Sequence, residues 1–412
     1  MTTIQKDRYA DLLIWSIGGV DGRCVAVMTE PVHRDFAVRV ARRAYALGAR
    51  LVTIDYADPL LVRARVELAR EEDLDTHPGF ARVTSEEYAG PQWSVIRIVG
   101  SAEPDYLEGM DPDRVARYAR SAREVGMPLS ETVSRFRKHW VGALLPTVAL
   151  AERSYPDSEP EDALARYEAE IVRILALDDE DPAAVWAERF RALSERRDRL
   201  NALDFDELLL SGPGTDLRIG LLPGTRWATA EAVMPDGRTA YVNMPSLEVF
   251  TTPDLRRTSG RVRATRPYLS TSSPGTLIRG AWFEFRDGAV ADFGAETGQE
   301  ALAGVLELDE QARYLGEIAL VDSQSAVATS DITFFNTLYD ENAAIHMALG
   351  RGFPRLVNGA QELAPAELIE LGVNHSLVHD DVMIGSREIS VDGVTRAGET
   401  VPVMREGCFV EE

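Results

Sequence analysis

The first half of the chain alternates between two hydrophobic patterns, one with the period of a helix and one typical of a short buried strand. Apolar residues recur every three or four positions in residues 9–17, 36–49 and 59–70, which predicts helices. Continuous apolar runs predict buried strands between them, at residues 24–30, 50–58 and 92–100. Because a strand, helix, strand order joins parallel strands by a right-handed crossover, we expect βαβ units.

The pattern changes near residue 205. Residues 160–177 and 182–203 predict two long helices whose many Glu and Arg side chains form a solvated face. Beyond them, short β-branched runs alternate with Gly and Pro turns, and only residues 334–353 predict a long helix. We therefore expect an α/β fold, with an N-terminal α/β domain at 1–205 and a β-rich α+β domain at 206–412.

Composition and charge narrow the classes of partner. The chain has 412 residues, 45% of them hydrophobic, and its formal net charge is −23. A field of that sign repels phosphate backbones and anionic lipid, so we expect neither nucleic acid nor a membrane as a partner. The chain has two cysteines and no apolar run long enough to span a bilayer, and we expect a cytoplasmic protein.

The segment NHSLVHDDVMIGS, residues 374–386, combines histidines and aspartates with a strand-like apolar run. His379 and Asp381 share one face of this predicted strand, about 7 Å apart, whereas Asp380 belongs to the other face. We expect Asp380 and His375 at the surface or behind the ligands. A lone His-x-Asp pair also fits a hydrogen-bonded histidine at a strand end.

Other candidate ligands lie upstream. His346 sits in the apolar stretch NAAIHMALG, so three of the six histidines fall between residues 346 and 379. Glu248 and Glu317 each lie in a short apolar run, where a buried carboxylate is costly unless it is paired or binds a metal. An exposed strand edge is the alternative for each glutamate. A mixed Glu, His and Asp set suits two divalent ions that share a bridging carboxylate.

Four motifs, NMPSLEVFTTPD, LGEIALVDSQS, FFNTLYDENAAIHMALG and VHDDVMIGS, resemble the aminopeptidase T/aminopeptidase S family of dinuclear metallopeptidases in their order and separations. GARLVTIDYADPLL and GPGTDLRIGL extend the resemblance over nearly the whole chain. It implies a homodimer with a C-terminal metal-binding domain, acting as an aminopeptidase with two divalent ions, Co, Zn, Mg or Mn. The implied metal ligands, with Glu317 as the bridge and catalytic carboxylate, are Glu248, Glu317, His346, His379 and Asp381.

Two positions depart from the family pattern. Phe353, in ALGRGFP, stands where the family commonly has a tyrosine, so no phenolic hydroxyl is available there. Leu247 replaces the first glutamate of the frequent Thr-Glu-Glu-Val-Phe-Thr pattern, although Glu248 persists. Both changes bear on rate or on recognition of the substrate.

The hypothesis is metal-assisted hydrolysis of a peptide's N-terminal amide bond, in which a carboxylate takes the proton of an activated water. Asp340, Glu341 and Asn342 are candidates for orienting the ligands or the substrate, with a plain surface position as the alternative.

Three other interpretations stay open. One is a hydrolase that tailors a peptide-like metabolite. Another is a non-haem Fe(II) ring-cleaving dioxygenase, whose two-His-one-carboxylate site would not need both Glu248 and Glu317. The third is a scaffold that has lost catalysis.

Overall fold

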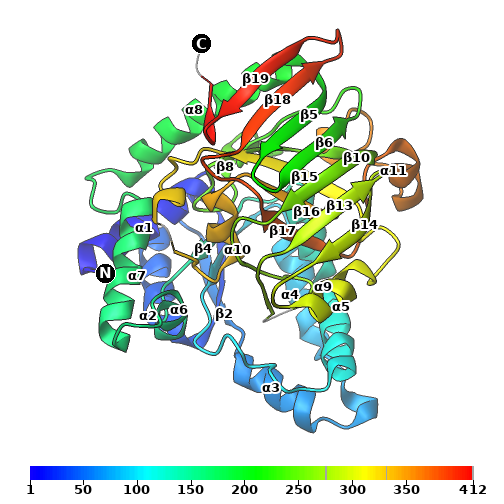
Figure 1. The fold of residues 1–412 in the computed structure, drawn as a ribbon. Helices are drawn as coiled ribbons and strands as arrows, with labels where there is room; N and C mark the ends of the chain where they lie inside the picture. Colours follow the sequence, from blue (N-terminus) through cyan, green and yellow to red (C-terminus); the bar gives the residue numbers. More distant parts are fainter. Residues whose placement is uncertain (274–275, 331, 411–412) are drawn as a thin grey trace. The chain divides into compact units, whose positions relative to one another are not determined.

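A computed structural model describes residues 1–273, 276–330 and 332–410 (Figure 1). The chain forms two compact units. Unit 1 comprises Met1–Ala187 and Ala230–Pro245, and unit 2 comprises Glu188–Thr229 and Ser246–Glu412. The first boundary between the two units therefore falls inside the helix that ends at Leu203. The later segment 230–245 belongs to unit 1 again. The domain boundary after residue 205 stays a prediction.

Unit 1 is built on a parallel sheet with the strand order β2-β1-β3-β4. Its strands are β1 (Cys24–Thr29), β2 (Leu51–Tyr56), β3 (Trp93–Val99) and β4 (Trp140–Leu144). A short antiparallel pair, β7 (Glu231–Val233) and β8 (Thr239–Tyr241), completes the unit. The predicted N-terminal α/β fold with parallel βαβ units is confirmed.

Helices cover both faces of this sheet, and its inner strand β1 is accordingly buried on both sides. Cys24 and Ala26 of β1 pack in one cluster with Tyr88, whereas Val25 and Val27, on the opposite face, are fully buried. The helices of unit 1 are α1 (Thr3–Ser16), α2 (Arg34–Ala46), α3 (Pro59–Leu68), α4 (Gly79–Ala89), α5 (Pro112–Ser134), α6 (Val148–Ser154) and α7 (Pro160–Ile174), followed by α8 (Pro182–Leu203), which continues into unit 2.

Local signals set several helix starts. Thr2 caps α1 in a capping box with Gln5, and Asp111 accepts hydrogen bonds from the first backbone amides of α5. Pro112 directly after Asp111 has the φ that a first helical residue needs. The helix α5 was not predicted from the sequence, although its start carries these signals.

Unit 2 contains a long antiparallel sheet and a shorter four-stranded one. The long sheet has the order β14-β13-β10-β6-β5-β18-β19-β20. Its strands are β5 (Phe205–Gly212), β6 (Thr215–Leu221), β10 (Pro253–Arg263), β13 (Trp282–Arg286), β14 (Ala289–Gly294), β18 (Ser390–Thr395), β19 (Thr400–Arg405) and β20 (Cys408–Phe409).

The short sheet has the order β17-β16-β15-β9, and all of its pairs are antiparallel. Its strands are β9 (Glu248–Thr251), β15 (Leu315–Val321), β16 (His346–Gly350) and β17 (His379–Met383). The remaining elements of unit 2 are a strand pair, β11 (Tyr268–Leu269) and β12 (Leu277–Ile278), and three helices, α9 (Gln299–Leu306), α10 (Thr337–Asp340) and α11 (Pro365–Leu371). The predicted β-rich C-terminal part is confirmed.

The long helix predicted for residues 334–353 is wrong. Helical structure covers only α10 and a 3₁₀ turn at Glu341–Ala343, and His346 begins a strand. All five residues of β16 are buried between two neighbouring strands, so the segment lacks the alternation of polar and apolar residues that identifies a half-buried strand. Gly350, at φ 92°, then ends the strand in a conformation that few other residues adopt.

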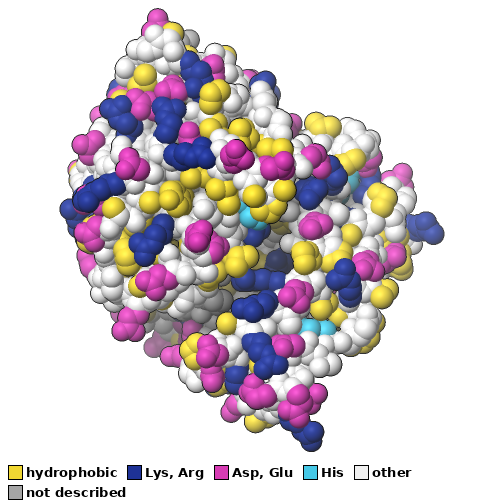
Figure 2. Space-filling model, turned by 90° about the vertical axis from the view of Figure 1, so that its right-hand side faces the viewer, with side chains coloured by type: hydrophobic (Ala, Val, Ile, Leu, Met, Phe, Trp, Pro, Cys, Tyr) yellow, Lys and Arg dark blue, Asp and Glu magenta, His cyan; other side chains and the backbone are white. Residues whose placement is uncertain are grey.

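No helix among the described residues is long and apolar enough to cross a membrane. Acidic and basic side chains are interspersed over the face of the molecule that Figure 2 shows, so the negative net charge is not gathered into one patch on that face.

Candidate metal centre

The four-stranded sheet brings the five predicted ligands to one of its faces. In antiparallel pairs, residues directly opposite each other point to the same side. Glu317 pairs with Ala348, which pairs with Asp381, and His379 lies two residues away on the same strand. His346 pairs with Ala319, two residues after Glu317, and Glu248 pairs with Val321, two residues further. The register therefore gathers Glu248, Glu317, His346, His379 and Asp381.

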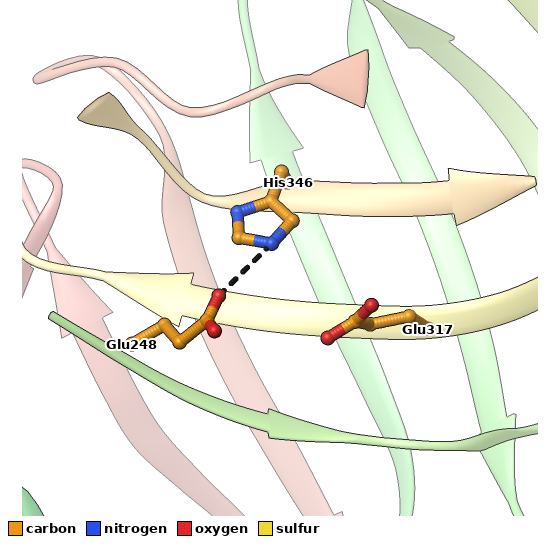
Figure 3. A group of neighbouring side chains, drawn as sticks. All are labelled: Glu248, Glu317 and His346. Atoms are coloured by element: carbon orange, nitrogen blue, oxygen red, sulfur yellow. Dashed lines mark ion pairs between the residues drawn. The ribbon is translucent and has the colours of Figure 1, made fainter. Parts of the chain in front are cut away.

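Their side chains form two groups, each compact enough to hold a metal ion. Glu248, Glu317 and His346 offer ligand atoms within 4.8 Å of one another, and so do Glu317, His379 and Asp381. Figure 3 shows the first group, with both carboxylates and the imidazole pointing into the same space. Glu317 belongs to both groups, which is the position that a bridging carboxylate requires.

Backbone carbonyls orient both histidines. The Nδ1 atoms of His346 and His379 lie 3.2 Å from the carbonyl oxygen of Ala344 and 2.8 Å from that of Arg351, respectively. An Nδ1–H donated to a carbonyl leaves Nε2 free to bind a metal. The Nε2 of His346 lies 3.1 Å from Glu248 Oε2, and that of His379 lies 3.3 Å from Glu317 Oε2.

The electrostatics of the cluster suit a cation. Burial opposes protonation of the two imidazoles, but the surrounding carboxylates outweigh it and raise the pKa of His346 to about 9 and that of His379 to about 10. Burial also raises the pKa of the Glu317 and Asp381 carboxyls. The buried Oε2 of Glu248 accepts no well-formed hydrogen bond from a described residue. These donors fit hard or borderline divalent ions.

Glu341 is a further acidic group beside this cluster. Burial, together with the charges of Glu248, Asp381 and Glu317, raises the pKa of the Glu341 carboxyl well above its usual range. The sequence marked Glu341 only as a residue that could orient ligands or substrate.

Asp340 and Asn342 have structural partners instead. Asp340 accepts hydrogen bonds from the backbone amides of Phe334 at 2.6 Å and Asn336 at 3.0 Å, and burial raises its pKa to about 7. Asn342 accepts a hydrogen bond from the Leu247 amide at 2.5 Å. Asn342 therefore fixes the segment directly ahead of Glu248.

Phe353 borders the cluster with a ring that has no hydroxyl. Its ring centroid lies 5.6 Å from that of His379 in an edge arrangement, and 5.1 Å from that of Phe250. Sequence reasoning missed Arg355, which is half-buried, with its guanidinium carbon 5.8 Å from the Phe250 ring centroid. Burial lowers the pKa of Arg355 to about 10, although the nearby charge of Glu317 opposes this shift. No sequence signal identified Arg355.

Asp380 is buried, in contrast to the surface position considered as one alternative. Its carboxylate accepts hydrogen bonds from Ser270 Oγ at 2.5 Å, Thr271 Oγ1 at 2.7 Å and the Ser272 amide at 2.9 Å. It thus ties residues 270–272 to the strand that carries His379 and Asp381. His375 belongs to neither ligand group.

Comparison with known proteins shows to which family the chain is similar. Residues 3–409 match the thermophilic metalloprotease (M29) family. Aminopeptidase 2 from Geobacillus stearothermophilus is 34% identical over 409 residues, covering 99% of this chain and 98% of that protein. Aminopeptidase T from Thermus aquaticus is 37% identical over 390 residues, 93% of each chain.

Two solved structures are similar to this chain in fold. Wild-type AmpT from Thermus thermophilus superimposes with a TM-score of 0.91 at 34% identity and covers 99% of both chains. The 2,5-dihydroxypyridine dioxygenase from Pseudomonas putida KT2440 aligns with a TM-score of 0.54 at 13% identity, over 99% of this chain and 97% of that one. At that identity the second likeness shows the fold alone.

The fold, the donor set and these relatives define a metal-dependent hydrolase. The chain belongs to the thermophilic metalloprotease (M29) family. The dioxygenase alternative is not favoured.

Proposed function

We propose that this protein is an aminopeptidase that hydrolyses the N-terminal amide bond of peptides with two divalent ions, Co, Zn, Mg or Mn. The ligands would be Glu248, Glu317, His346, His379 and Asp381, with Glu317 shared between the ions. The observation that carries the proposal is the membership of Glu317 in both compact donor groups. A mononuclear iron site would leave Glu248 without a role.

When bound, two such ions supply an activated water and polarise the carbonyl of the scissile bond. The chain's own residues then orient the metal-binding histidines and accept the proton of the water. The Ala344 and Arg351 carbonyls hold His346 and His379 in the orientation that presents Nε2. Glu341, whose short helical turn packs against the strand that carries His379 and Asp381, is the carboxylate that would take the proton of the attacking water.

Phe353 lies edge-on beside His379 and has no hydroxyl to donate, so charge developing on the carbonyl oxygen receives no phenolic donor there. We expect the enzyme to depend on the metals and on Arg355 for this charge. A narrower substrate range than that of a general peptidase would fit this difference.

The test uses the purified full chain reconstituted with Co²⁺ or Zn²⁺, with metal content measured by plasma mass spectrometry. It is incubated with short peptides and their N-acetylated twins, and products are followed by mass spectrometry. Stepwise loss of N-terminal residues from free peptides alone, with two ions per chain, is the expected result. Uptake of oxygen with one iron per chain, or equal cleavage of acetylated peptides, contradicts the proposal.

We also propose that the protein works as a cytoplasmic homodimer. The cysteines of the described residues, Cys24 and Cys408, are free thiols, which suits a reducing compartment. Leu60, Leu61 and Leu68 of α3 are exposed, which suits a surface covered by a second copy. The negative charge of the chain argues against nucleic acid and membrane surfaces as partners. Light scattering after size exclusion should give twice the chain mass.

A further inference from the structure

A cavity of about 680 Å³ lies beside the candidate metal centre, within unit 2. Its wall includes Val321, which pairs with Glu248 across the sheet. It also includes Ala344 and Ile345, the two residues directly before His346. The cavity therefore lies at the end of the sheet where Glu248 and His346 stand, although neither of these two residues lines it.

The charged residues of its lining are all basic. Arg266 and Arg387 contribute to the wall, together with hydroxyl groups such as those of Ser323 and Ser386, and no Asp or Glu belongs to the described lining. This is notable in a chain with 67 acidic and only 44 basic residues. The cavity is thus suited to an anion although the protein as a whole repels one.

The two arginines are held differently. Arg266 donates hydrogen bonds to the carbonyls of Ala328 at 3.2 Å and Ile332 at 3.4 Å, which fixes its guanidinium at the wall. Arg387 is exposed, and its side chain makes no hydrogen bond or ion pair with any residue that the structure describes. Arg387 is therefore available to a ligand, and its guanidinium fork matches a carboxylate.

The larger apolar members of the lining are Val321, Ile332, Ile345 and Pro267, and Thr265, Thr329 and Thr333 add further hydroxyl groups. Small-molecule sites combine apolar side chains with placed polar groups in this way. The space is larger than one amino-acid side chain needs, so it suits a length of peptide that ends in an anion.

We propose that this cavity receives the part of the substrate on the C-terminal side of the scissile bond, and that Arg266 and Arg387 bind its free C-terminal carboxylate. This inference rests on the proposed aminopeptidase function and names its substrate class. Because the carboxylate must reach the arginines from a bond held at the metal centre, the preferred substrates are peptides of two to four residues, on the order of what a cavity of this size accommodates.

The experiment compares leucyl-glycyl-glycine with its C-terminal amide on the metal-loaded full chain. The acid should be cleaved with a kcat/KM roughly tenfold higher, chiefly through KM, because a charge-assisted bidentate contact is lost in the amide. Arg387→Gln should abolish this preference by lowering kcat/KM on the acid to about the level of the amide. Arg387→Lys should restore part of it.

Arg218→Gln is the matched control, because Arg218 is a surface arginine of unit 2 that pairs with Glu207, and neither residue belongs to the cavity lining. It should leave the preference intact. Equal cleavage of acid and amide by the unsubstituted enzyme overturns the inference alone. Arg387→Gln losing activity only on peptides with an acidic N-terminal residue, whatever their C-terminus, also overturns it. Cleavage of neither peptide overturns the proposed function, and the inference with it.

Discussion

Each unit of the molecule buries a cluster of charged side chains, and the two clusters differ in how their charges are balanced. In unit 1, Arg23 donates to Ser94, Asp236 and the carbonyls of Pro91 and Trp93. In unit 2, three carboxylates and two imidazoles face one another, with Glu341 as a further acid nearby.

Lys138 and His139 belong to the cluster of unit 1 and are satisfied in the same way. Lys138 donates to the carbonyl of Gly90 at 2.5 Å, and His139 Nε2 lies 3.0 Å from Asp236. A buried charge that the protein satisfies by itself serves the fold, whereas a buried acidic excess is stabilised by a cation that the chain does not supply. The comparison thus separates a structural cluster from a functional one.

The largest expected effect is that of Glu317→Gln. The substitution keeps the shape but removes the charge shared by both donor groups, so we expect activity to fall on the order of a thousandfold or more. Metal content should fall to one ion per chain or less. Without metal, the variant should be at least as stable as the parent, because a buried like charge is gone. Retained metal binding and cleavage would contradict the role of Glu317.

Arg23→Met should have the opposite profile. It removes the hydrogen bonds that Arg23 donates to Ser94 and to the Pro91 carbonyl, whereas Asp236 keeps Arg238 and His139 as donors and the Trp93 carbonyl keeps Lys138. Two buried acceptors lose their donor, which should lower the free energy of unfolding by about 2 kcal/mol. Urea unfolding measures this change. Metal content and kcat should match the parent at a temperature where both are folded, and a loss of bound metal would break the distinction between the clusters.

The pH dependence of stability should show the cost of burying Lys138. Burial, with the charge of Arg23, lowers the pKa of Lys138 to about 8. Between pH 8 and the unfolded pKa of about 10.4, the unfolded chain binds more protons, so stability rises with pH. The gain should be on the order of 2 kcal/mol across this range relative to Lys138→Met. Parallel pH profiles of the two proteins would show that the shift is absent.

Phe353→Tyr should have the smallest effect. It places a hydroxyl beside His379, where the family commonly has one, and a hydrogen bond to developing charge should raise kcat about five-fold with little change in KM. Steady-state kinetics on a neutral tripeptide measure it, with Phe353→Leu as the control for packing. A lower kcat in the tyrosine variant would show that the pocket has adapted to the phenylalanine.

Prediction from the sequence was most reliable where an apolar run or a helical period of apolar residues identified the element. The strand predicted at 24–30 appears as β1 (Cys24–Thr29), and the helix predicted at 160–177 as α7 (Pro160–Ile174), because local periodicity is sufficient to predict them. It failed at β16, whose residues are buried on both sides and therefore read as an apolar helix. His346 was predicted as a candidate ligand on a helix, whereas the structure places it at the start of β16.

The sequence by itself determined the two-part α/β and β-rich architecture, the family, and the five side chains that the structure gathers. Residue types, hydrophobic periodicity and the order of motifs are properties of the chain itself, so they can be recognised without a structure. Only the tertiary structure decided that Glu317 lies in both donor groups and that Asp380 is buried. It also decided that the carboxylates of these groups raise the pKa of Glu341. Those facts depend on strand register and on burial, which are set by contacts between residues far apart in the chain.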